Sequence, residues 1–322
     1  MEGTHKKTGR HMMLKEVLRR YATLRDLSDR TVQIYGESIA QFAKFLGHEP
    51  TVDDLEDMAV AEFIRWRAKQ TRGTRLISPE TVTKDRTHIL CLWTFTCKKK
   101  LHPTGEWPGL PKRHRITHTP DAYTAEDIQK LVIASRYRIG RIAGRPAGWW
   151  WPGLIMALFQ TGERIGAVMA TRWSDVDLER GWITFRASTR KGRSEDNVKR
   201  ISPELVAWLK QHAGMPNELV WPWDRLPRSI YASWRVLCEK AGVRNRAFHA
   251  FRKSSCSYVH AAGGDATAHA MHADPEMTLR HYLDPKITGR GSSLALLPKI
   301  DMGPCADEPE SPDAEFVPED AA

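Results

Sequence analysis

The segment 161–185 reads TGERIGAVMATRWSDVDLERGWITF, and it decides how the second half of the chain folds. It follows the apolar stretch 149–159, which has no charged residue and predicts a buried core helix. It ends in Trp182 to Phe185, where the residues alternate as in a half-buried strand. A buried helix, then Arg164 and then a strand of a small sheet are therefore expected in this order.

The sequence after this segment continues the sheet and then returns to helices. Residues 191–196 (KGRSED) form a polar turn before Val198 and Ile201, which predicts a short hairpin. Helical segments are then expected at 231–241, 249–262 and 266–271. The fold class predicted for this half is mainly α with a small antiparallel β-sheet.

Residues 12–105 show helical spacing of apolar residues and no strand signal. Ser28 is expected to cap one helix, and Ser78, which a proline follows, to cap another. These signals predict a small bundle of four or five short helices. Composition then changes at 106–120, which is rich in proline and basic residues and is typical of a linker, before a helix start at Thr124.

The charge of the chain is strongly positive but unevenly distributed. There are 49 Lys+Arg against 39 Asp+Glu, which gives a formal net charge of +10 and a pI near 9.4. Residues 301–322 contain eight acidic residues, four prolines and no Lys or Arg, so residues 1–300 carry +18. This charge favours a polyanionic partner, and the composition of the acidic tail is typical of disorder.

Composition excludes several classes of protein. The longest uncharged stretch, 146–162, has 17 residues, whereas a membrane-spanning helix needs about 20. No secretory signal is visible, and five cysteines without a C-x-x-C pair argue against disulfides or a cysteine zinc site. No glycine-rich nucleotide-binding motif occurs. We therefore expect an intracellular protein with reduced thiols and no membrane association.

Six polar residues of the second half stand out by their type and order: Arg164, Lys191, His249, Arg252, His272 and Tyr282. Each has an ordinary explanation by itself, such as a charged turn, a solvated helix face or a tyrosine packed at a helix end. Only His249 and Arg252, three residues apart, are placed together by helical spacing. Their combined order and spacing indicate a shared site.

This order resembles the tyrosine recombinase (phage integrase) family, whose pattern is arginine, hairpin lysine, H-x-x-R, a second histidine and tyrosine. The segments 161–164 and 170–177 resemble the family's first arginine box and the strand entry after it, and 272–282 its second histidine and tyrosine box. The likeness extends over about residues 12–300. It implies an N-terminal helical core-binding (SAM-like) domain and a C-terminal tyrosine-recombinase catalytic domain.

The resemblance and the composition together divide the chain into five parts. We expect a flexible basic N-terminus (1–11), a helical core-binding, DNA-binding domain (12–105), a basic linker (106–120), the catalytic domain (121–300) and a disordered acidic tail (301–322).

The resemblance also implies the chemistry: a site-specific DNA recombinase or integrase that cleaves and rejoins duplex DNA through a covalent 3′-phosphotyrosine intermediate. Two arginines suit the charge that develops on the equatorial oxygens of the phosphate. Tyr282 would attack the phosphate, and His249 is the candidate for accepting its proton. The family gives Lys191 the role of acid for the 5′-oxygen and has His272 hydrogen-bond the phosphate. No metal or other cofactor is implied.

Two positions near these residues depart from the family pattern. The family often has an acidic residue three positions after the first arginine, where this chain has Ala167, although Glu163 precedes Arg164. The glycine that commonly precedes the second histidine is Met271.

The position of the nucleophile and that of the acid each have an alternative. The interval between histidine and tyrosine is one residue longer than usual, which places His281 at the expected position. Tyr282 is preferred because it is the only tyrosine after Tyr258 and an imidazole replaces a phenol poorly. The hairpin is extended, so Lys199 stays a second candidate for the acid beside Lys191.

DNA contacts are expected from basic residues of the helical module and the linker: Lys98, Lys99, Lys100, Lys112, Arg113 and Arg115. A further basic cluster at 136–145 is equally well explained as a solvated loop. The tryptophans at 149–151 are expected in the core, since duplex DNA exposes few base faces.

Strand exchange in the family implies a homotetramer on duplex DNA, with 292–299 as the segment that reaches a neighbouring protomer or else packs on its own domain. An accessory directionality or DNA-bending protein and a cytoplasmic, nucleoid-associated location are also expected. Two other interpretations stay open: a type IB topoisomerase-like relaxing enzyme, and a catalytically inactive DNA-binding derivative of the fold. The complete set of six residues argues against the inactive derivative.

Overall fold

The computed structural model describes residues 12–111, 118–190, 195–272 and 274–289. The chain divides into two compact units, Met1–Ile116 and Thr117–Ala322. No helix in the described ranges is long and apolar enough to cross a membrane. Several predictions concern residues outside these ranges, namely 1–11, Lys112, Arg113, Arg115, Lys191, 292–299 and the tail 301–322.

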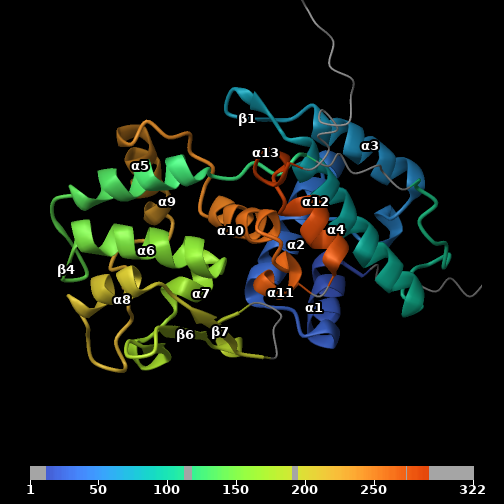
Figure 1. The fold of residues 1–322 in the computed structure, drawn as a ribbon. Coiled ribbons are helices and arrows are strands. Elements are labelled where there is room, and N and C mark those ends of the chain that lie inside the picture. The colour runs from blue at the N-terminus through green and yellow to red at the C-terminus, as the bar shows by residue number, and fades with distance from the viewer. Residues whose placement is uncertain (1–11, 112–117, 191–194, 273, 290–322) are drawn as a thin grey trace, which may run out of the picture. The chain divides into compact units, whose positions relative to one another are not determined.

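Unit 1 is a helical bundle, as predicted (Figure 1). Its described helices are α1 (Leu14–Arg25), α2 (Asp29–Leu46), α3 (Asp57–Ala68) and α4 (Pro79–Lys98), with a 3-10 turn, η1, at Val52–Asp54. Their apolar faces share one core, in which Phe42 and Phe63 are fully buried. Ser28 accepts the N–H of Thr31 at 3.4 Å and Ser78 that of Thr81 at 3.3 Å, so both caps are confirmed.

The prediction that residues 12–105 contain no strand was wrong at one place. A hairpin of β1 (Thr71–Arg72) and β2 (Arg75–Leu76) connects α3 to α4, and Gly73 in its turn adopts φ +65°. All four strand residues are exposed. An exposed two-residue strand buries nothing, so no alternation of apolar and polar residues marks it in the sequence.

Unit 2 is mainly helical with a small antiparallel sheet, which confirms the predicted fold class. Its described helices are α5 (Ala125–Arg136), α6 (Ala147–Thr161), α7 (Ile165–Met169), α8 (Pro203–Lys210), α9 (Ser229–Lys240), α10 (His249–Ala261), α11 (Ala266–Ala270), α12 (Pro275–His281) and α13 (Pro285–Thr288). The sheet has the order β5 (Val176–Asp177), β6 (Trp182–Phe185), β7 (Asn197–Arg200). Shorter elements are the hairpin β3 (Arg141–Ile142) with β4 (Arg145–Pro146), and the 3-10 turns η2 (Trp173–Asp175) and η3 (Ala187–Thr189).

Helix α6 lies at the centre of the core of unit 2. Figure 1 shows it beside α5, and it also contacts α8 and α10. Trp149, Trp150 and Trp151 are 3%, 0% and 0% exposed, so these tryptophans lie in the core as predicted. The helix ends at Gly162, whose φ of +63° turns the chain sharply. The residues that follow this turn reach the functional site.

Candidate active site

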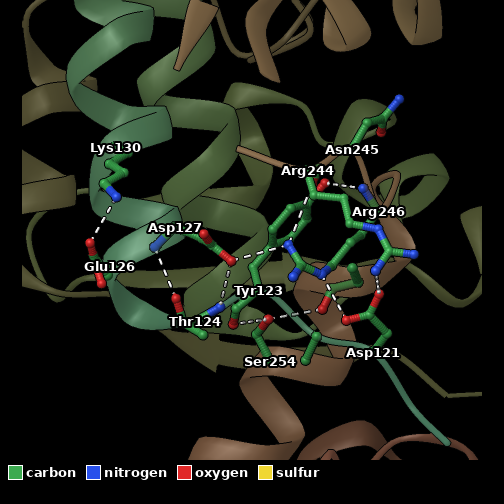
Figure 2. Close-up of polar contacts among 12 residues, drawn as sticks. Asp121, Tyr123, Thr124, Glu126, Asp127, Lys130, Arg244, Asn245, Arg246 and Ser254 are labelled. Atoms are coloured by element: carbon green, nitrogen blue, oxygen red, sulfur yellow. Dashed lines mark hydrogen bonds and ion pairs between the residues drawn. The ribbon is translucent and has the colours of Figure 1, made fainter. Parts of the chain in front are cut away.

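The loop before α10 is anchored to the start of unit 2 (Figure 2). The guanidinium of Arg246 bonds to the carboxylates of Asp121 at 2.8 Å and Asp127 at 3.1 Å. The backbone N–H of Arg246 donates to the hydroxyl of Tyr123 at 2.8 Å. Within α10, Ser254 donates to the carbonyl of Tyr123, also at 2.8 Å. These contacts fix the first turns of α10, the helix that carries His249 and Arg252.

Arg252 joins three segments that are far apart in the sequence. Its side chain is 1% exposed, and Nη1 donates to the carbonyl of Gly162 at 2.6 Å. Nη2 donates to the carbonyl of Ala270 at 2.6 Å and contacts Nε2 of His272 at 2.9 Å. The guanidinium therefore holds the end of α6 and the end of α11 against α10.

The contacts of His272 define its tautomer. Arginine only donates hydrogen bonds, so Nε2 of His272 accepts from Arg252 and the ring proton lies on Nδ1. Nδ1 then donates to Oγ1 of Thr278 in α12 at 2.7 Å. The carbonyl of Thr278 accepts the N–H of Tyr282 at 3.1 Å. A continuous series of hydrogen bonds thus runs from Arg252 to the backbone of Tyr282.

Tyr282 ends α12 and packs its ring among the predicted site residues. Its ring centroid lies 4.2 Å from that of His272 and 5.4 Å from that of His249. The Cζ of Arg252 is 5.5 Å from the centre of the ring. Tyr282 is 7% exposed, and Ser257 in α10 donates to its carbonyl at 3.2 Å. The structure therefore brings four of the six predicted residues into direct contact.

His249 lies at the edge of this cluster, at the start of α10. Burial of the ring, together with the positive charges of Arg252, Lys253 and Arg164, lowers the pKa of His249 to about 4. The residue as a whole is nevertheless exposed to solvent at the N-terminal end of the helix. At neutral pH the ring is neutral and can accept a proton.

Arg164 directly precedes α7 and is half-buried. Burial is the first cause that lowers the pKa of Arg252, and the charge of Arg164 is the next. The same charge also acts on His249. The interaction between two charges weakens with their separation, so an effect on both residues indicates that Arg164 lies near Arg252 and His249.

The two alternatives named from the sequence occupy different environments. His281 is exposed at the end of α12, whereas its neighbour Tyr282 is buried in the cluster. Lys199 in β7 donates from Nζ to the carbonyl of His269 at 2.7 Å. Burial, and then the charges of nearby arginines, lower the pKa of Lys199 although Glu163 opposes them. The first candidate for the acid, Lys191, lies outside the described residues.

Some residues that support the cluster were not predicted from the sequence. Thr278 orients His272, and Ser257 holds the backbone of Tyr282. Arg190, whose side chain is 1% exposed, pairs with Glu163 at 2.8 Å. A hydroxyl four residues before a tyrosine, or an arginine in a basic turn, is too common to indicate such a role. Only the tertiary contacts reveal it.

The basic residues proposed to contact DNA are partly visible. Lys98, Lys99 and Lys100 are exposed at the end of α4. In the cluster at 136–145, Arg138 donates to the carbonyl of Ser233 at 3.2 Å and Arg145 to that of His212 at 2.6 Å. These two arginines have structural partners and are not simply parts of a solvated loop.

Comparison with known families matches both units of the chain. Residues 14–103 match the phage integrase N-terminal SAM-like domain, and residues 122–287 match the phage integrase family. A putative tyrosine recombinase XerC of Pseudomonas aeruginosa is 23% identical over 271 residues, which cover 75% of this chain and 61% of that protein. The chain thus spans about three fifths of the length of this curated relative.

Two solved structures share the fold. A lambda integrase dimer bound to a COC′ core site has a TM-score of 0.62 at 16% identity, covering 83% of this chain and 97% of that one. A XerH site-specific recombinase bound to palindromic difH, in a post-cleavage complex, has a TM-score of 0.62 at 15% identity, covering 88% and 84%. With both units matched and the predicted residues clustered around a tyrosine, the chain belongs to the phage integrase family of tyrosine recombinases.

Proposed function

We propose that this chain is a site-specific recombinase that cleaves and rejoins duplex DNA through a covalent 3′-phosphotyrosine link at Tyr282. The observation that carries the proposal is the packing of Tyr282 against His272, His249 and Arg252, at 4.2, 5.4 and 5.5 Å. Tyr282 also belongs to a small buried cluster with Cys256, Ala266, Ala270 and Leu283, but apolar packing alone would not require the three polar groups beside its ring. A phenol among two imidazoles and a guanidinium suits attack on a phosphate.

Arg164 and Arg252 would bind the non-bridging oxygens of the scissile phosphate. The Nε of Arg252 is buried and has no hydrogen-bond partner among the described residues. A buried charged donor without a partner raises the free energy of the folded state by roughly 1 kcal/mol or more. A phosphate oxygen would satisfy this donor, and a phosphorane-like transition state would strengthen the bond as negative charge develops.

The cleavage step transfers two protons, one from the phenol of Tyr282 and one to the departing 5′-oxygen. The phenol oxygen of Tyr282 bonds to phosphorus, and its proton passes to the neutral ring of His249. The bond from phosphorus to the 5′-oxygen breaks, and that oxygen takes a proton from Lys191, with Lys199 as the alternative. Rejoining is the reverse reaction with the 5′-hydroxyl of another strand, so the phosphodiester count is unchanged and no nucleotide is consumed.

The proposed partners follow from this reaction. Duplex DNA would contact the basic residues Lys98, Lys99, Lys100, Lys112, Arg113 and Arg115. Exchange between two duplexes needs four strand cleavages and hence a homotetramer on DNA. An accessory protein that bends DNA or sets direction would act in the same complex, in the cytoplasm at the nucleoid.

Covalent trapping on DNA tests the proposal. Duplexes from the DNA that flanks the coding gene, and a pool with a randomised core, are incubated with the protein, and adducts that survive denaturation are sequenced. The selected duplex is then nicked next to the cleaved bond, so that the short strand diffuses away and the adduct accumulates. Wild type is expected to form an adduct, and absence of any adduct from both sources would refute the proposal.

Tyr282→Phe is the decisive variant, because phenylalanine keeps the ring and removes the nucleophile. It is expected to reduce the adduct to background while duplex binding is retained. The matched control is Tyr137→Phe, at a residue that is 80% exposed, which should form adduct like wild type. Relaxation of a supercoiled plasmid that lacks the selected site would favour the topoisomerase alternative.

A further inference from the structure

Glu163 carries a buried charge between two predicted site segments. It lies in the turn between α6 and α7, directly before Arg164, and its side chain is 1% exposed. A carboxylate removed from water must be matched by hydrogen bonds and opposite charge, or the fold is strongly destabilised. The partners of its two oxygens therefore show what the residue holds.

One carboxylate oxygen holds the hairpin between β6 and β7. Oε1 accepts from Nδ2 of Asn197 at 2.7 Å and pairs with Nη2 of Arg190 at 2.8 Å. Both partners are buried. In the sequence they stand on either side of residues 191–196. A single carboxylate oxygen of Glu163 thus contacts the residue before residues 191–196 and the residue after them.

The other oxygen faces the two arginines proposed to bind phosphate. Oε2 accepts the backbone N–H of Arg164 at 3.1 Å and lies 4.0 Å from Nη1 of Arg252. A separation of 4.0 Å is too long for a hydrogen bond, so the attraction to Arg252 is electrostatic. The residue before, Gly162, supplies the carbonyl that accepts from the same guanidinium. Two consecutive residues therefore set the position and charge balance of Arg252.

The charges around Glu163 do not cancel, and the remaining positive charge suits a phosphate. Burial opposes ionisation of the carboxyl, but the bond from Asn197 and the charges of Arg190 and Arg252 lower the pKa of Glu163. It is therefore ionised at neutral pH. One carboxylate faces two buried guanidinium groups, so one positive charge remains unmatched, and an anionic phosphate can match it.

We propose that Glu163 is a positioning residue for strand cleavage, which fixes Arg252 by charge, Arg190 by an ion pair and the start of β7 by a hydrogen bond from Asn197. This inference rests on the proposed function. Its carboxylate has no contact with DNA in this scheme, so its removal should slow the chemical step and leave duplex binding intact.

Glu163→Gln tests this division between binding and chemistry. The amide keeps the size of the side chain and one acceptor but removes the charge. At saturating protein, the single-turnover cleavage rate on the selected nicked duplex should fall roughly 10–100-fold, since small displacements of reacting groups have effects of this size. The dissociation constant for the same duplex should stay within about twofold of wild type. The control is Glu218→Gln. The carboxylate of Glu218 lies 3.1 Å from Arg145 and takes no part in the cluster, so this variant should cleave at the wild-type rate.

A double variant separates positioning from simple stabilisation. In Glu163→Gln with Arg190→Met the buried pair is replaced by neutral side chains, which restores much of the stability lost in the single variant. Arg252 still lacks its counter-charge, so cleavage should stay slow although the melting temperature recovers.

Two results would overturn the inference. One is cleavage by Glu163→Gln at the wild-type rate, and the other is recovery of the rate in the double variant in step with its melting temperature. Either result can be read only when wild type forms the Tyr282 adduct. Failure of wild type to form it refutes the proposed function instead, so the two failures are distinguishable.

Discussion

Met271 adopts φ +49°, a left-handed conformation that glycine takes most easily. It ends α11, and its N–H donates to the carbonyl of Ala268 at 3.0 Å. A glycine commonly precedes the second histidine in the family, and this backbone conformation supplies the physical reason. Here the methionine side chain has a contact of its own, because its Sδ lies 3.5 Å from Nη2 of Arg190. The departure noted from the sequence thus preserves the backbone turn that places His272.

His269 gives the free protein a defined dependence of stability on pH. Burial, and then the charges of Lys199 and Arg252, lower the pKa of His269 to about 4, and its Nε2 contacts Oγ of Ser255 at 2.7 Å. The unfolded state, with an ordinary histidine pKa near 6.5, binds this proton first. Stability is therefore fully present above about pH 6.5 and is lost as the pH falls towards 4.

The expected loss between pH 7 and pH 5 from this one residue is about 2 kcal/mol. Urea unfolding of wild type and His269→Asn at both pH values measures it, because asparagine keeps a polar group beside Ser255 and does not titrate. The slope with pH should be shallower in the variant. Equal slopes would show that His269 does not carry the effect.

At the scale of elements, α10 is the helix on which the site depends. Its first residue is His249, its fourth is Arg252, and its ninth, Ser257, reaches the backbone of Tyr282. The helix lacks a side-chain cap at its N-terminus. The anchor instead is Arg246, which links the preceding loop to the start of unit 2. Orientation of α10 is thus set by charge pairs and not by a local capping signal.

Arg246→Met is expected to lower the free energy of unfolding by about 2 kcal/mol, since two charged hydrogen bonds are lost. Methionine keeps the apolar stem that covers Tyr123. Cleavage should also slow, because the first turn of α10 is no longer held. Denaturant unfolding and the trapping assay measure the two effects.

Arg244→Met is the matched control for this variant. Arg244 lies 3.5 Å from Asp121, the same carboxylate, but its side chain is 77% exposed. An exposed pair of this kind contributes about 0.5 kcal/mol or less. A similar loss in both variants would contradict the anchoring role of Arg246.

At the scale of the whole molecule, the chain consists of two units with separate apolar cores. One core contains Phe42 and Phe63, and the other is built around Trp150 and Trp151. The positive charge of the body is accompanied by an acidic tail at 301–322. Basic residues bind the phosphates of DNA whatever the DNA sequence. Nearby acidic residues compete with these phosphates for the same Lys and Arg side chains.

Deleting residues 301–322 raises the formal net charge from +10 to +18, because eight acidic residues are removed. Affinity for a random-sequence duplex should rise about tenfold at low salt, and the difference should shrink at high salt. Dissociation constants measured from 50 to 200 mM salt test this. A tail of equal length with its acidic residues changed to Asn and Gln should behave like the deletion, and wild-type behaviour of that variant would exclude a charge effect.

The sequence by itself determined the helical bundle, the buried helix before Arg164 and the strand at 182–185. Through its resemblance to the family it also predicted the histidines and the arginine that lie beside Tyr282. Periodicity, caps and the order of a few polar residues are local signals, so they survive without coordinates. The exposed hairpin at 71–76 left no such signal because it buries nothing.

Only the tertiary structure decided how those residues cooperate. It placed Glu163 between Arg190 and Arg252, joined Arg252 to Tyr282 through His272 and Thr278, and anchored α10 through Arg246. These contacts join residues up to 125 positions apart. The physical reason is that a buried charge is stable only beside partners that the fold brings from elsewhere, and no local pattern records which partners those are.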